Sequence, residues 1–156
     1  MGGVGTSILG RPRHLPRDRR ASHHPTSDYT LNCEEPHFVI KFAVTTTGCT
    51  TVSSATLRLT DNANGSVKGG DFHTTGTAWN ESTVTYGNSP ARGTLLASLG
   101  AVTSGGTHTV DVTRGVSTLN GTAAFRAGST SGDGAQYSSK EGGTTAQKPQ
   151  LTVVCA

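Results

Sequence analysis

Apolar and polar residues alternate in short runs along most of the chain. Phe38, Ile40 and Phe42 occupy alternate positions, with Val39 and Lys41 between them. Because successive side chains of a β-strand point to opposite faces, such period-two runs predict strands with one buried face. The pattern returns in six further runs, whose apolar members are Ala55, Leu57 and Leu59; Val84 and Tyr86; Leu95, Ala97 and Leu99; Val110 and Val112; Ala123, Phe125 and Ala127; and Leu151, Val153 and Cys155.

Turn residues separate these runs. Gly, Asn, Asp and Ser cluster at residues 61–65, 69–70, 104–106, 120–121 and 131–134. A strand and a turn therefore recur about every 8–12 residues, which is typical of a β-sandwich or barrel. Residues 113–119 are the one place where a short helical turn is predicted.

Composition agrees with an all-β fold. Gly, Thr and Ser together supply 62 of the 156 residues, and the apolar share is only 32%. Thr favours strands through its branched Cβ, whereas Gly and Ser serve turns. The predicted inward-facing set is enough for a modest core, and it consists of Phe38, Ile40, Phe42, Leu57, Leu59, Tyr86, Val110, Val112, Phe125, Leu151 and Val153.

The first 32 residues differ from the rest. They show no periodicity and hold five of the thirteen basic residues, namely Arg11, Arg13, Arg17, Arg19 and Arg20. We predict an irregular or disordered segment over 1–32 and one sandwich domain over 33–156. From residue 38 onward, eight basic residues face six acidic ones. Since the basic cluster lies outside the periodic region, nucleic-acid binding is not predicted.

Three cysteines leave the redox chemistry open. Cys33, Cys49 and Cys155 contain no Cys-x-x-Cys pair, so a zinc site is not predicted. One disulfide with one remaining thiol, or free buried thiols, both fit the sequence, and spacing does not choose the pair. No apolar run reaches transmembrane length, so membrane insertion is not predicted.

Catalytic and cofactor motifs are absent from the sequence. It contains no Gly-x-Ser-x-Gly, His-Glu-x-x-His or phosphate-binding loop. His73 and His108 flank no obvious nucleophile. The single carboxylates in loops and at strand ends, Asp61, Asp71, Asp111 and Asp133, do not form an EF-hand pattern. We therefore predict no enzyme activity and no cofactor, with a structural calcium left open.

Five short segments, in order, resemble carbohydrate-binding module family 96, also called the DNRLRE domain. They are residues 54–59, residues 79–81 with 84–86 and 88–90, residues 110–113, residues 139–141 and residues 149–151. The resemblance covers residues 38–153, although the hexapeptide that names the domain is absent. It implies a non-catalytic, antiparallel, jelly-roll-like β-sandwich of the kind attached to secreted polysaccharide lyases and cell-surface proteins, whose characterised members bind alginate.

Four cations lie out of phase with the apolar faces and are predicted to reach solvent. They are Arg58, Arg126, Lys140 and Lys41. A guanidinium can hold a uronate carboxylate through two parallel hydrogen bonds. If Arg58, Arg126 and Lys140 share one sheet, they form a cationic groove for an acidic glycan. The alternative is ordinary solvated strand faces.

Four other residues carry the structural part of the resemblance. Trp79 fits either a sugar platform or a loop anchor, and its position in the family favours the anchor. Glu81 is predicted to cap the turn that precedes the strand containing Val84 and Tyr86, with calcium ligation as the lesser alternative, and Tyr86 is predicted to join the core. Glu141 is placed to form a local ion pair with Lys140.

These observations lead to one prediction and two alternatives. The prediction is non-catalytic binding of an acidic polysaccharide such as alginate, by a module of a larger secreted or cell-surface protein located outside the cell. One alternative is a structural or adhesion spacer without glycan affinity. The other is a small lyase or hydrolase, which needs a cleft holding a Lys, Tyr or His beside an acid.

Overall fold

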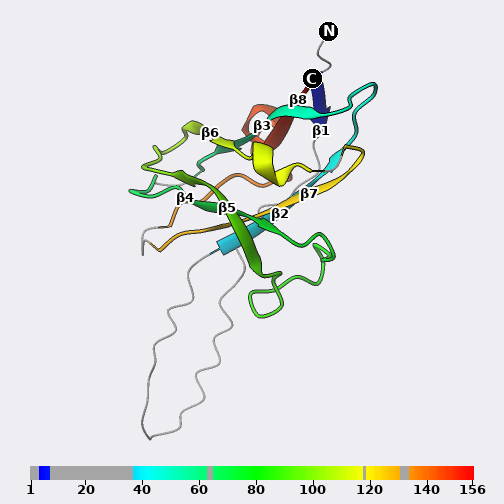
Figure 1. The fold of residues 1–156 in the computed structure, drawn as a ribbon. Coiled ribbons are helices and arrows are strands. Elements are labelled where there is room, and N and C mark those ends of the chain that lie inside the picture. The colour runs from blue at the N-terminus through cyan, green and yellow to red at the C-terminus, as the bar shows by residue number, and fades with distance from the viewer. Residues whose placement is uncertain (1–3, 8–36, 63–64, 118, 131–133) are drawn as a thin grey trace, which may run out of the picture.

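Two four-stranded antiparallel sheets face each other in the computed structural model (Figure 1). The structure describes residues 4–7, 37–62, 65–117, 119–130 and 134–156. The first sheet has the order β1-β8-β3-β6, and the second has the order β2-β7-β4-β5. The strands are β1 (Val4–Ser7), β2 (His37–Val44), β3 (Val52–Thr60), β4 (Gly70–Thr75), β5 (Arg92–Leu99), β6 (Thr107–Asp111), β7 (Gly121–Gly128) and β8 (Gln150–Cys155). Two 3-10 turns, η1 (Thr113–Gly115) and η2 (Thr145–Gln147), complete the elements.

The alternating runs correctly predict six of these strands. Runs centred on Ile40, Leu57, Val110, Phe125 and Val153 become β2, β3, β6, β7 and β8, and the weaker run at Leu95 becomes β5. The predicted all-β sandwich is therefore confirmed. The helical turn expected within 113–119 is present as η1.

Three elements differ from the sequence-based prediction. The run containing Val84 and Tyr86 is not a strand, because its apolar side chains pack onto β2 rather than joining a ladder. Strand β4 was not predicted, since Phe72 is its only large apolar residue. Strand β1, inside the segment predicted to be irregular, pairs antiparallel with β8 and so extends that edge of the first sheet.

The core fills the space between the sheets. Ile40, Phe42 and Phe125 from the second sheet meet Leu57 and Leu151 from the first, and all five are fully buried. Burying each large side chain contributes about 1.5–3 kcal/mol. The predicted inward set is buried except for Tyr86, which is only half-buried in a separate cluster on the outer face of β2.

Tyr137 is a core residue that the periodic pattern did not indicate. Its ring packs edge-on against Phe38, with centroids 5.8 Å apart, and its hydroxyl donates a hydrogen bond of 2.9 Å to the carbonyl of Gly69. Its backbone forms an isolated bridge with Asp61. Tyr137 thus fastens the segment before β8 to the second sheet through its side chain and to the end of β3 through its backbone. Burial raises the pKa of the Tyr137 hydroxyl above its usual value.

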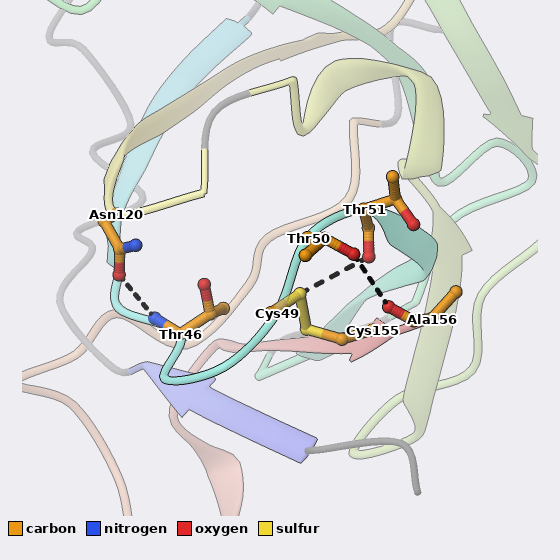
Figure 2. The surroundings of a disulfide bond; sticks show 7 residues. All are labelled: Thr46, Cys49, Thr50, Thr51, Asn120, Cys155 and Ala156. Atoms are coloured by element: carbon orange, nitrogen blue, oxygen red, sulfur yellow. Dashed lines mark hydrogen bonds between the residues drawn. A yellow bond between two sulfur atoms is a disulfide. The ribbon is translucent and has the colours of Figure 1, made fainter.

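A disulfide between Cys49 and Cys155 joins the loop after β2 to the end of β8 (Figure 2). Their Cα atoms lie 5.5 Å apart. The same loop is held at its other end by Asn120, whose Oδ1 accepts a hydrogen bond of 2.8 Å from the backbone N–H of Thr46. Cys33, the third cysteine, lies outside the described residues.

The strand registers gather several strand ends at one end of the sandwich. Val44 at the end of β2 pairs with Gly121 at the start of β7, and Thr75 at the end of β4 pairs with Arg92 at the start of β5. In the first sheet, Val52 at the start of β3 pairs with Cys155. We call this region the disulfide end, and η1 lies in it because η1 contacts β3, β5 and β7.

Candidate functional site

The connection between β4 and β5 folds over the outer face of β2 (green in Figure 1). We call residues 76–91 the Trp79 loop. Val39 points away from the main core, yet it is fully buried because Trp79, Val84 and Tyr86 pack against it. In this structure Trp79 therefore packs against β2 and holds the loop to it.

Two of the cations predicted to bind glycan hold this loop in place. The Nζ atom of Lys41 lies 4.5 Å from the centroid of the Trp79 ring and donates a hydrogen bond to the carbonyl of Trp79. Arg126 donates from Nη1 to the carbonyl of Pro90 at 2.7 Å and to the Ser89 hydroxyl at 3.2 Å. These contacts tie the outer faces of β2 and β7 to the loop.

The third cation joins the Trp79 loop to the segment before β8. Lys140 Nζ lies 3.3 Å from Glu81 Oε2, and each side chain is about a quarter exposed. The cap of the turn comes from Asn80, whose Oδ1 accepts a hydrogen bond of 3.0 Å from the backbone N–H of Ser82. Lys140 is thus ion-paired with Glu81. The predicted pair between Lys140 and Glu141, and the predicted cap by Glu81, stay predictions.

Arg58 lies on the other sheet. It stands on β3 opposite Thr109 of β6 and Gln150 of β8, and its Nη2 donates to the carbonyl of Ala146. Leu57 and Leu59 on either side of it point into the core. The condition for a cationic groove, that Arg58 and Arg126 share one sheet, is therefore not met. A direct glycan contact by each of these cations stays a prediction.

A polar cleft of about 460 Å³ opens at the disulfide end. We call it the threonine cleft. The end of β4 and the start of the Trp79 loop supply one wall, the start of β7 supplies another, and η1 with Ser117 supplies the third. Its lining consists of Thr74, Thr75, Thr77, Arg114, Gly115, Ser117, Thr122, Ala123 and Ala124.

Gly115 allows η1 to lie close enough to the sheets to form this wall. A Cβ atom at that position would stand 2.7 Å from Leu96 Cδ1 and 2.9 Å from Phe125 Cε1, which is closer than side-chain carbons approach. The residue before it, Arg114, is thereby held over β5. Its Nη2 donates to the carbonyls of Leu95 and Leu96, at 3.1 and 3.3 Å.

Irregular pairing between β4 and β5 shapes the opposite wall. The register shifts between Phe72 and His73 and again between His73 and Thr75, and each shift adds one residue to β5. Bulges of this kind bend a strand and redirect its side chains. The bulged strand here is β5, whereas Thr74 of β4 keeps its regular pairing with Phe125 of β7.

Sequence reasoning missed this cleft. Arg114 was considered only as part of a short helical turn, and residues 74–77 carry no apolar alternation. The available signals were three threonines within residues 74–77, and an Arg-Gly pair after the Val110 strand. Neither signal predicts that residues 74–77 and 114–117 lie side by side in the fold.

The acidic residues are held separately. Lys68 donates a hydrogen bond of 2.8 Å to Asp71 and keeps the pKa of that carboxyl below its usual value. Hydrogen bonds from Thr113 likewise keep the pKa of the Asp111 carboxyl below its usual value. Over the described residues, no three His, Cys, Asp or Glu side chains gather in a way that could hold a metal ion. No helix within the described ranges is long and apolar enough to cross a membrane.

A protein-family comparison matches most of the chain. A search of curated proteins finds no relative. A comparison with protein-family profiles matches carbohydrate-binding module family 96 over residues 26–154 of the 156. This range contains β2 to the end of β8 except for its last residue, together with the Trp79 loop and the threonine cleft. The chain therefore belongs to carbohydrate-binding module family 96.

Proposed function

We propose that this chain binds an acidic polysaccharide such as alginate, without catalysing a reaction, as a module of a larger secreted or cell-surface protein. The observation that carries the proposal is the family match over residues 26–154. The excess of basic over acidic residues from residue 38 onward, eight against six, favours an anionic ligand.

The expected binding is weak and sensitive to salt. Arg recognises a carboxylate through two parallel hydrogen bonds, and the strength of an exposed charge pair falls as ions screen it. Sugar hydroxyls add neutral hydrogen bonds to the many Thr and Ser side chains of the surface. Added salt therefore weakens the charge pair between Arg and the carboxylate but not the neutral hydrogen bonds. Measuring binding at two salt concentrations separates the two contributions.

The lining of the threonine cleft supports a role without catalysis. A lyase or hydrolase needs an acid, or a Lys, Tyr or His, at the bond that it breaks. None of the lining residues that the structure describes has a carboxylate, an amine, an imidazole or a phenol.

A location outside the cell is part of the proposal. The disulfide between Cys49 and Cys155 supports it, because disulfides persist in oxidising compartments and are rare in reducing ones.

Affinity electrophoresis in gels containing alginate or a neutral glucan tests the proposed function. We expect alginate to retard the protein at low salt, less retardation at high salt, and little retardation by the neutral glucan. Equal retardation by both polymers would contradict a preference for acidic polysaccharides. No retardation by either would contradict carbohydrate binding of this kind.

A spacer without glycan affinity is the second candidate, and one observation favours it. Lys41, Arg58 and Arg126 each donate a hydrogen bond to a backbone carbonyl of this chain. Three of the four predicted cations therefore contribute to the fold itself. A spacer role predicts a stable sandwich that neither polymer retards.

A further inference from the structure

We propose that the threonine cleft is the polysaccharide-binding site and that Arg114 binds a carboxylate of the sugar chain there. This inference rests on the proposed function and deepens it, because it moves the site away from the strand-face cations. The volume of about 460 Å³ lies within the roughly 300–1,000 Å³ common for ligand sites.

The hydroxyl groups of the cleft fall into two sets. Those of Thr74 and Thr75 are used inside the fold, since Thr74 accepts from the N–H of Thr94 in β5 at 2.9 Å and Thr75 donates to the carbonyl of Ala91, directly before β5, at 2.8 Å. Three further hydroxyls line the cleft without any hydrogen bond inside the described part of the chain, and they belong to Thr77, Ser117 and Thr122. They are available to the hydroxyl groups of a sugar.

Arg114 is a preorganised cation. Its Nη2 is fixed on the carbonyls of Leu95 and Leu96, whereas its Nη1 and Nε groups make no hydrogen bond with the described residues. A side chain that is already ordered loses less entropy when it binds a ligand. The charge of the Asp111 carboxylate acts on Arg114. The hydroxyl of Thr113 holds this carboxylate by donating a hydrogen bond of 2.6 Å to its Oδ1.

The chemistry of the lining defines the class of ligand. None of the residues described around the cleft is aromatic, so stacking on a sugar ring does not contribute. Hydroxyls combined with one guanidinium suit a ligand that offers both hydroxyl groups and a carboxylate, which is the composition of a uronic-acid polymer. A neutral glucan would satisfy the hydroxyls and leave Arg114 without its partner.

The test compares variants for retardation by alginate. Arg114→Gln removes the charge and keeps an amide donor, and we expect it to weaken apparent binding by about tenfold, the effect of losing one charge-assisted contact. Lys148→Gln removes the same charge two residues before the start of β8, at the strand end remote from Cys155, and is the matched control. It is expected to bind like the wild type.

A second variant keeps the charge and leaves the bonds to β5 intact. Thr77→Val combined with Thr122→Val removes two cleft hydroxyls that make no internal hydrogen bond, and we expect apparent binding to fall about 2- to 10-fold. Thermal denaturation of every variant verifies folding. This double variant decides the question if Arg114→Gln does not fold.

The outcomes separate the two proposals. If the wild type binds alginate and both cleft variants bind equally well, the cleft is not the site although the proposed function stands. Equal losses in Arg114→Gln and Lys148→Gln would show a response to net charge alone and would also overturn the inference. A loss in Arg58→Gln without a loss in the cleft variants would move the site to the first sheet. If the wild type does not bind, both proposals fail.

Discussion

Tyr137 shows how much one side chain contributes at a position that sequence periodicity does not mark. Its ring lies against Phe38, and its hydroxyl satisfies the carbonyl of Gly69. Tyr137→Phe keeps the packing and removes the hydrogen bond. We expect the free energy of unfolding at pH 7 to fall by about 1–3 kcal/mol, because a buried carbonyl loses its partner. Urea denaturation measures it.

The same residue predicts a dependence on alkaline pH. Burial raises the pKa of Tyr137 in the folded protein above the ordinary 10.0, so the folded state holds this proton more tightly than the unfolded state. The contribution is complete below about pH 10 and is lost as pH rises beyond it. Stability should therefore fall less steeply above pH 10 in Tyr137→Phe than in the wild type. Parallel curves for the two proteins would contradict this account.

At the scale of elements, the Trp79 loop acts as a cover for β2. Trp79→Ala would expose Val39 and remove the ring that Lys41 contacts. We expect the free energy of unfolding to fall by about 1–3 kcal/mol, less than for a fully buried aromatic residue because Trp79 is half-buried.

Limited proteolysis gives the matching local measurement. Cleavage within 76–91 should become faster in Trp79→Ala, while Thr83→Ala in the exposed part of the same loop should leave it unchanged. Unchanged stability and cleavage in Trp79→Ala would show that the loop does not depend on its anchor.

The sequence predicted strands correctly where one face of the strand is buried in the core. It failed where contacts between distant segments determine the local structure. Phe38, Ile40 and Phe42 mark β2 because one face of that strand meets the core. Val84 and Tyr86 show the same alternation, yet they belong to a loop whose buried side faces β2. Likewise, the nearness of Gly115 to Leu96 and Phe125 exists only after the sheets have assembled. No local pattern therefore indicates the threonine cleft.

For the whole molecule, the disulfide closes a long loop. Cys49 and Cys155 are 106 residues apart in sequence, so the bond restricts nearly all of the sandwich when it is unfolded. Replacing both cysteines with Ser should lower the free energy of unfolding by about 2–4 kcal/mol. The wild type should lose similar stability in reductant, and the double variant should lose no more. Equal stability of the variant and the oxidised wild type would contradict this role.

The arrangement of charge across the molecule decides where an acidic polymer can bind. Arg58 stands on the sheet opposite to Lys41 and Arg126, so these cations cannot act on one sugar segment together. Arg114 at the disulfide end combines a fixed guanidinium with hydroxyl groups in one cleft. This distribution of cations favours one binding site at the disulfide end of the sandwich over a groove across a sheet.

Titrating isotope-labelled wild-type protein with an alginate oligosaccharide, and following its amide resonances by NMR, tests this account most directly. We predict saturable chemical-shift changes concentrated in residues 74–77, 114–117 and 122–124, reduced by salt and absent with a neutral oligosaccharide of the same length. Shifts confined to the outer face of β3 and β6, or no shifts at all, would contradict it.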